Sequence, residues 1–170
     1  MSMISESNPS GTTQITKLIS DFDLEDGASR QRARQALVEL GKPVIPFLMK
    51  HLEDKNDRVR WEIAKTFQEL RDLSAAPALV NLLQDDVPGI RWLAGEGLIN
   101  FKQDALIPLL KGLQVHFQSI FSREGAHHVL RELEREGFLN KKSLDALEAL
   151  EGSAPAVSVA FAAAEALRSL

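Results

Sequence analysis

Cysteine and tyrosine are both absent from this 170-residue chain. Without cysteine the protein can form no disulfide, no thiolate-bound metal site and no thiol nucleophile, a composition compatible with a reducing cytosol. No apolar run reaches the length of a transmembrane helix, and Met1 to Gln14 lack the basic and apolar segments of a signal peptide. We therefore expect a cytoplasmic protein with no membrane partner.

An excess of charge of one sign is also missing. The chain has 20 Lys and Arg against 24 Asp and Glu, which gives a net charge of −4. Such a chain has no overall attraction to phosphate backbones or anionic lipids. Nothing in the sequence resembles a nucleophile beside its base or a glycine-rich phosphate loop. These absences predict a protein that is not an enzyme, binds no nucleic acid and carries no cofactor or metal.

What the chain does contain is an internal repeat. The pattern Arg-x-x-apolar-x-x-x-apolar-x-x-apolar occurs four times, and its arginines follow one another by 30, 31 and 32 residues. Pro46, Pro77 and Pro108 are each separated by 31 residues. A fixed period in this range is typical of a repeat solenoid, which presents a surface for holding other molecules. The four patterns begin at Arg30, Arg60, Arg91 and Arg123.

Each repeat is interpreted as a pair of helices. In the first helix, the arginine and the three apolar positions share one face at a period of 3.6 residues. The second helix opens around the proline, where no intrahelical N–H is required. The innermost positions are predicted to be Leu37, Phe67, Leu98 and Leu130 in the first helices, and Leu48, Leu79 and Leu110 in the second helices.

One repeat domain is predicted over residues 13–170, preceded at 1–12 by a tail that is disordered or partly an expression remnant. A short helix at 13–22 leads into the repeats. The helix near 141–150 is assigned as the second helix of the fourth repeat, and the capping segment as one more first helix. The repeats lie near 28–55, 56–86, 87–115 and 116–151, with a C-terminal capping helix at 153–170.

Residues 28–136 resemble HEAT repeats, in the short form seen in phycobilisome-lyase-type HEAT-like proteins of bacteria. The strings DRVRWEIAKTFQEL (57–70) and VPGIRWLAGEGLINF (87–101) carry this resemblance. It implies an all-α fold, a right-handed α-solenoid of HEAT-like helix pairs.

HEAT repeats usually carry an aspartate six residues before the repeat arginine. Asp54 precedes Arg60 and Asp85 precedes Arg91 in this way. In the family these groups form a ladder between adjacent repeats, and the resemblance implies the same role here. Since the other two arginines have Leu24 and Phe117 at the aspartate position, we expect only two full rungs.

The resemblance says little about activity. We expect a non-catalytic scaffold that binds another protein or a peptide. An accessory or subunit of a bilin-attaching lyase is one alternative, from the resemblance alone. A nucleic-acid-binding HEAT-like protein is another, based on Arg30, Arg32, Arg34, Lys55 and Arg58. Some HEAT-repeat enzymes hold di-iron through repeated His-Glu dipeptides, and this sequence contains none.

The second helices supply the predicted binding face, because in HEAT-type solenoids they line the concave side. Both charge signs and several amides occur there, which suits a polar protein surface or peptide. A simply solvated face is the alternative. The predicted face consists of Lys50, Glu53, Asn81, Gln84, Lys111 and Gln114.

Paired aromatic and histidine residues give further candidates. Trp61 and Trp92 each follow a repeat arginine, and their recurrence favours packing across the joint between repeats over gripping a partner. His128, with Glu132 one turn later, could hold a metal, but two ligands rarely suffice. We expect instead a partly buried His127 and a surface His128.

The C-terminal helix is apolar around most of its circumference. Either it packs against the fourth repeat, or it pairs with a second copy in a homodimer.

Overall fold

The computed structural model describes residues 9–152 and 156–170, and all regular elements in these ranges are helical. Within these ranges, five short 3-10 turns connect the α-helices; they are η1 (Asp21–Asp23), η2 (Lys42–Val44), η3 (Met49–His51), η4 (Leu73–Ala75) and η5 (Lys102–Ala105). The α-helices are α1 (Pro9–Ser20), α2 (Gly27–Leu40), α3 (Ile45–Leu48), α4 (Asp57–Leu70), α5 (Ala76–Leu82), α6 (Pro88–Ile99), α7 (Leu106–His116), α8 (Ile120–Arg135), α9 (Lys141–Glu151) and α10 (Ala156–Arg168).

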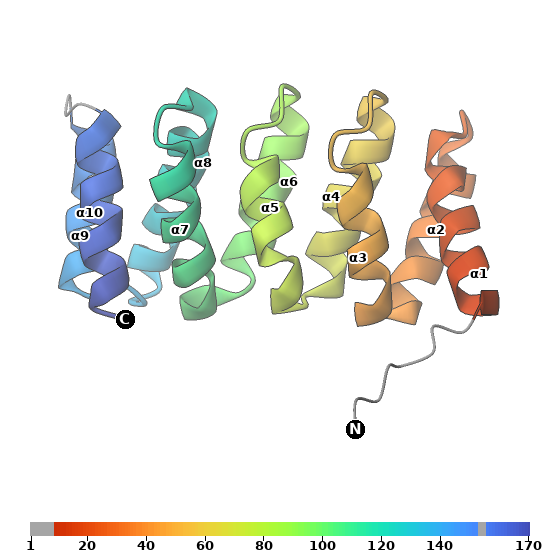
Figure 1. Ribbon diagram of the computed structural model, residues 1–170, viewed down its shortest axis with the longest axis horizontal. Helices are drawn as coiled ribbons and strands as arrows, with labels where there is room; N and C mark the ends of the chain where they lie inside the picture. The colour runs from red at the N-terminus through yellow and green to blue at the C-terminus, as the bar shows by residue number, and fades with distance from the viewer. Residues whose placement is uncertain (1–8, 153–155) are drawn as a thin grey trace.

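The helices stand in two rows (Figure 1). We call α2, α4, α6, α8 and α9 the first-helix row, and α1, α3, α5, α7 and α10 the second-helix row. Along the first row α4 packs on α6 and α6 on α8, and along the second row α5 packs on α7 and α7 on α10. Helices contact mainly their neighbours in the stack, as expected of a repeat solenoid. The all-α solenoid predicted from the repeat is confirmed.

Side-chain caps fix the start of most first-row helices. Asp26 begins α2, Asn56 begins α4, Ser119 begins α8 and Asn140 begins α9, each by accepting hydrogen bonds from main-chain N–H groups of the first turn. These N–H groups have no partner within the helix, so the caps stabilise the helix starts.

The predicted core register is confirmed. All seven side chains assigned to the innermost positions of the helix pairs are 0% exposed, namely Leu37, Leu48, Phe67, Leu79, Leu98, Leu110 and Leu130. Helix α1 likewise buries Ile15 and Ile19, and the following turn η1 buries Phe22, but the helix begins at Pro9 rather than at residue 13. The predicted tail of residues 1–12 was therefore too long; residues 1–8 lie outside the described ranges.

The last two helices occupy different rows from those predicted. Gly137, at φ 79°, ends α8, and the Phe138 N–H donates to the carbonyl oxygen of Leu133 at 2.9 Å. This Schellman turn returns the chain beside α8, without the 3-10 turn that elsewhere leads into the second row. As a result α9 lies in the first-helix row, and α10 contacts α7 and α9 in the second-helix row.

Helix α10 buries one side and exposes the other. Val159, Ala163 and Ala166 are buried against the neighbouring helices, whereas Val157 and Phe161 are 63% and 66% exposed. The helix therefore packs on the solenoid and also carries exposed apolar side chains. None of the described helices is both long enough and apolar enough to cross a membrane.

Candidate functional site

Every repeat arginine makes the same main-chain contact. In each of the four repeats its Nη1 donates to the carbonyl oxygen six residues earlier. A main-chain acceptor does not depend on the side chain at that position, so leucine and phenylalanine serve as well as aspartate. The donor and acceptor residues are Arg30 and Leu24 (2.7 Å), Arg60 and Asp54 (2.8 Å), Arg91 and Asp85 (2.7 Å), and Arg123 and Phe117 (2.6 Å).

The joint between α4 and α6 is closed by a two-pronged ion pair. Arg60 donates through Nε to Asp85 Oδ2 at 2.8 Å and through Nη2 to Asp85 Oδ1 at 3.1 Å. Its Nη2 also reaches Asp86 Oδ1 at 2.6 Å. Such planar, charge-assisted pairs are among the stronger hydrogen bonds in proteins. This contact links one repeat to the loop that begins the next.

The ladder pairs predicted from the sequence, Asp54 with Arg60 and Asp85 with Arg91, do not form ion pairs in the structure. The Asp54 side chain accepts the main-chain N–H of Asn56 at 2.9 Å, while Asp85 pairs with the arginine of the preceding repeat. Arg91 has no carboxylate partner among the described residues and lies 4.1 Å from the ring centroid of Phe121. The ladder thus has one such rung rather than two.

The Arg60–Asp85 pair shifts the pKa of both groups. The hydrogen bond to Asp85 raises the pKa of Arg60, with burial acting in the opposite direction. Burial raises the pKa of Asp85, but hydrogen bonds from Arg60 and from the Val87 N–H outweigh this effect. The pKa of Asp85 therefore lies below its ordinary value of 3.8. Both groups are therefore charged near neutral pH.

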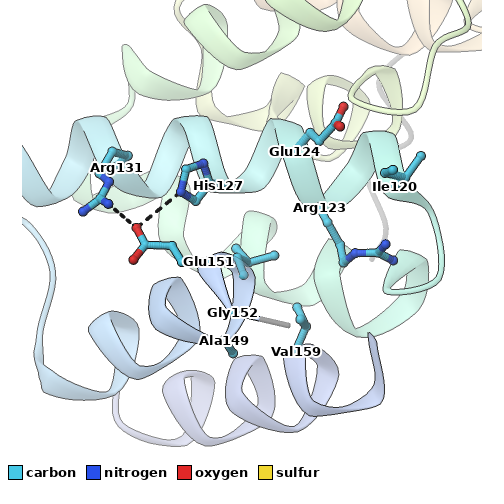
Figure 2. A pocket seen from close by; sticks show the side chains of 10 residues that line it. Ile120, Arg123, Glu124, His127, Arg131, Ala149, Glu151, Gly152 and Val159 are labelled. Atoms are coloured by element: carbon cyan, nitrogen blue, oxygen red, sulfur yellow. Dashed lines mark hydrogen bonds and ion pairs between the residues drawn. The ribbon is translucent and has the colours of Figure 1, made fainter. Parts of the chain in front are cut away.

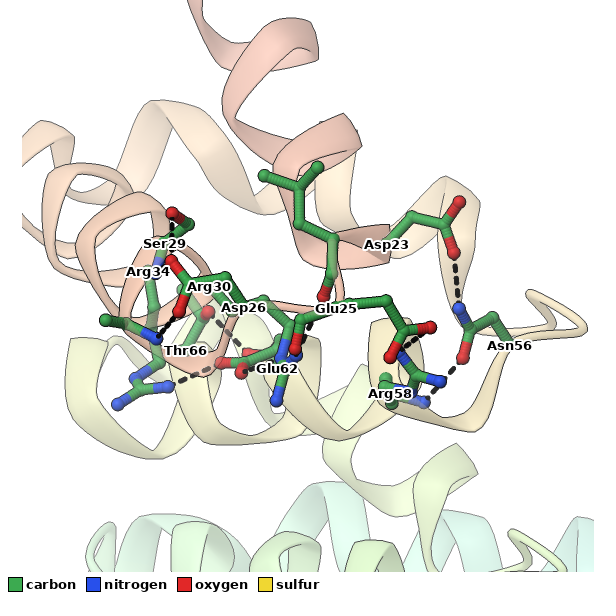
Figure 3. Close-up of polar contacts among 12 residues, drawn as sticks. Asp23, Glu25, Asp26, Ser29, Arg30, Arg34, Asn56, Arg58, Glu62 and Thr66 are labelled. Atoms are coloured by element: carbon green, nitrogen blue, oxygen red, sulfur yellow. Dashed lines mark hydrogen bonds and ion pairs between the residues drawn. The ribbon is translucent and has the colours of Figure 1, made fainter.

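At the joint between α2 and α4 the residue that aligns with Asp85 is Asp54, but Arg30 pairs instead with Glu62 on α4 (Figure 3). Its buried carboxylate accepts hydrogen bonds from Arg34 and, at 3.3 Å, from Arg30 Nε. Arg58 pairs with Glu25 at 2.9 Å, and Arg32 lies 3.6 Å from the Asp26 carboxylate. Four of the five basic residues considered for nucleic-acid binding are therefore paired with acidic side chains.

A polar hollow of about 670 Å³ lies where α8 meets α9 and α10 (Figure 2). His127 Nε2 is 3.3 Å from Glu151 Oε1, and Arg131, one turn further along α8, pairs with the same carboxylate. His128 is 31% exposed and meets Glu96 at 3.1 Å, whereas Glu132 pairs with Arg135. Within the described ranges, no three metal-binding side chains gather.

The tryptophans contact neighbouring repeats. The Trp92 ring lies 4.9 Å from the His128 ring across the joint between α6 and α8, and the Arg34 guanidinium lies 5.9 Å from the Trp61 ring across the joint between α2 and α4. These contacts agree with packing across the joints. Trp92 nevertheless remains 58% exposed.

The structure brings four of the six predicted face residues together. Lys50, Glu53, Asn81 and Gln84 line a hollow of about 610 Å³ on the second-helix row. Lys111 lines the neighbouring hollow instead. Gln114, the sixth predicted residue, is exposed on α7.

Sequence reasoning missed that neighbouring hollow, a mainly apolar groove of about 530 Å³ between α5 and α7. Leu73, Ile107 and Val115 line it and are 44%, 47% and 71% exposed. Asn81 and His116 line both hollows, so the two are adjacent. The sequence did contain a signal for this groove, because Leu73 and Val115 stand at positions where other repeats have polar residues.

Comparison with known proteins is consistent with this architecture. The family model for HEAT repeats matches residues 15–99 and 45–119, which together exceed half of the chain. A search of curated proteins found no match. Among solved structures, the complex of CpcE and CpcF of phycocyanin lyase from Nostoc sp. PCC7120 matches with a TM-score of 0.60 and 24% identity, over 91% of this chain and 98% of that chain. At this identity the match shows a shared fold.

Proposed function

Because the chain belongs to the HEAT-repeat family, we propose that it is a non-catalytic interaction module that binds another protein or a peptide on its second-helix row. The observation that carries this proposal is the pair of adjacent hollows that share Asn81 and His116. A right-handed superhelix with this row on its concave side is part of the proposal. The matched solved structure is itself a complex of two proteins, which supports a protein partner.

The chemistry of the polar hollow favours a protein surface over a phosphate backbone. Lys50 and Glu53 bring opposite charges to it, and Asn81 and Gln84 bring amides that both donate and accept hydrogen bonds. A face built for phosphates would instead gather cations. Polar groups of mixed character around a partly apolar surface are typical of protein interfaces.

A charge-reversal variant tests the proposal. The native partner is first captured from the source organism and identified, and its affinity is then measured by calorimetry. Lys50→Glu combined with Lys111→Glu should weaken binding by about tenfold or more, since both side chains are exposed on the proposed face. The thermal melting curve should stay nearly unchanged.

A matched control reverses two exposed lysines away from this face, Lys141→Glu with Lys142→Glu on α9. The control should keep its affinity for the partner. Unaltered affinity in the Lys50/Lys111 variant would move the site to the edge formed by Trp61 and Trp92 or to α10. For α10, sedimentation that shows a dimer sensitive to Phe161→Gln would indicate a homodimer.

A second candidate function is an accessory or subunit of a bilin-attaching lyase. It is supported by the structural similarity to the phycocyanin lyase complex, which covers nearly the whole length of both chains. If this holds, mixing the protein with a bilin and chromophore-free phycocyanin subunits should accelerate formation of a covalently coloured product. Absence of any acceleration, with a native protein partner still bound, would leave the interaction module alone.

A further inference from the structure

The groove between α5 and α7 is apolar at positions where the repeat does not require it. When the repeats are aligned on their prolines, Leu73 stands at the position of Lys42 and Asp104. Both of these polar residues are exposed, as is Leu73 at 44%. A position that is lysine in one repeat and aspartate in another does not hold the solenoid together. The leucine therefore belongs to the surface of this one groove.

Val115, on the opposite wall, is likewise apolar at a position where other repeats have polar residues. Its equivalents are Glu53 and Gln84, which are both polar and line the neighbouring hollow. Val115 is 71% exposed, the largest exposed fraction among the exposed large apolar residues of the described chain. Two independent polar-to-apolar changes on facing walls indicate a surface that is covered by another molecule.

Close packing of the two helices forms the floor of the groove. A Cβ atom on Gly112 would lie 2.2 Å from Val80 Cγ1, so glycine is what allows α7 to approach α5 at this point. Val80 and Ala76 are buried beneath the groove. The walls, from Leu73 to Val80 and from Ile107 to Val115, each extend for about two helical turns, or roughly 12 Å.

The scarcity of hydrogen-bonding groups favours a helix as the occupant. Asn81, Lys111 and His116 are the polar side chains among the lining residues. An extended peptide laid here would bury main-chain N–H and C=O groups without enough partners, which is unfavourable. A helix satisfies these groups internally and presents apolar side chains one turn apart. Two such side chains match the length of the walls.

The charge of the groove sets a further requirement for its occupant. No carboxylate lines the groove, and Lys111 is exposed on its rim without an ion-pair partner among the described residues. An acidic side chain on the occupant would complement this cation.

We propose that the groove between α5 and α7 is the docking site for an amphipathic helix of a partner protein, with two apolar side chains one turn apart and an acidic residue beside them. This rests on the proposed function, because it names the partner class for the same second-helix row. The groove supplies the apolar contact, and Lys111 sets the orientation of the helix.

The test uses a defined probe, a phage-displayed library of helix-forming 16-residue peptides with one randomised face, selected on the full-length protein. Selected peptides should carry two apolar residues four apart and an adjacent Glu or Asp. Leu73→Lys combined with Val115→Gln should weaken their binding by about tenfold or more. Both replacements are residues that occupy the equivalent positions of other repeats, so the fold should tolerate them.

Two further variants sharpen the result. Lys111→Glu should shift the selected peptides from acidic to basic residues at the position beside the apolar pair. The matched control Val157→Gln removes an apolar side chain of similar exposure (63%) on α10 and should leave peptide binding unchanged.

Several outcomes would overturn the proposal: selection of no peptide, selected peptides without the pattern, or equal binding to the Leu73/Val115 variant. Self-association that disappears in the same variant would assign the groove to a second copy instead. If the native partner responds to Lys50→Glu with Lys111→Glu but not to the Leu73/Val115 variant, the interaction function stands and the groove assignment fails.

Discussion

The joint between α4 and α6 and the joint between α6 and α8 use the same arginine position in different ways. Arg60 grips the Asp85 carboxylate with two hydrogen bonds, whereas Arg91 lies over the Phe121 ring. Both arginines also donate to the main-chain oxygen six residues earlier. The main-chain contact is therefore what repeats, and the contact across the joint varies with the side chain that the next repeat offers.

This difference has physical consequences. The side chains of Arg60 and Asp85 are 11% and 4% exposed, so removing either leaves a poorly hydrated charge. A cation over an aromatic ring at the surface is worth about 0.5–1 kcal/mol and leaves no charge stranded when it is lost. The two joints should therefore differ in their response to mutation and pH while sharing the same apolar core.

The largest expected effect tests the shared core. Leu79→Ala in α5 and Leu110→Ala in α7 each remove a side chain that is 0% exposed. Each should lower the free energy of unfolding by about 2–5 kcal/mol, through lost burial and a residual cavity. Urea denaturation followed by far-UV circular dichroism measures this loss. The exposed Leu73→Ala serves as control and should change stability little; a similarly small loss at Leu79 would contradict the assigned core.

Next in size is the contrast between the two arginines. Arg60→Ala should lower the free energy of unfolding by about 2–4 kcal/mol, because Asp85 is left charged and buried. Arg91→Ala should lower it by only about 1–2 kcal/mol, from the lost main-chain hydrogen bonds and ring contact. Arg131→Ala, on the surface of α8, should have a smaller effect than either. Equal losses for Arg60 and Arg91 would show that the carboxylate adds nothing to the joint.

The pH dependence separates the joints further. The folded-state pKa of Asp85 lies below its ordinary value of 3.8, so its stabilising contribution is present above that value and is lost as the pH falls through the folded pKa. The stability difference between wild type and Asp85→Asn should therefore be constant at neutral pH and shrink below about pH 4. The difference for Phe121→Leu at the other joint should not shrink, because Phe121 does not titrate. Parallel pH profiles for the two differences would argue against the ion pair.

Periodicity was sufficient to predict the fold in most of the chain. Apolar residues at helical spacing, such as Leu37 and Leu98, share one face of a helix, and that face must be buried against a neighbouring helix. Periodicity failed at α9 and α10, where the row is decided by the turn at Gly137 and not by the helix pattern. The rows of α9 and α10 could therefore be assigned only from the structure.

The ladder partners were mispredicted for a related reason. Six residues of separation places Asp54 near Arg60, but the main-chain oxygen of that residue is what the arginine reaches, and its carboxylate turns to the Asn56 N–H. The apolar groove escaped notice because candidates were chosen for polarity, whereas Leu73 and Val115 stand out only when repeats are compared position by position. The residues selected from the sequence were thus all polar, and none of the exposed apolar residues that line the groove was among them.

The smallest expected effect concerns the tryptophan contacts across the joint between α6 and α8 and the joint between α2 and α4. Trp92→Ala removes the contact with His128, and Trp61→Ala removes the contact with Arg34; each should lower the free energy of unfolding by about 1 kcal/mol. Since the chain has 2 tryptophans, each variant keeps one as a fluorescent reporter of unfolding. A double-mutant cycle of Trp92→Ala with His128→Ala should return a coupling of about 0.5–1 kcal/mol. Zero coupling, together with lost affinity for a native partner in Trp92→Ala, would instead assign this exposed ring to binding.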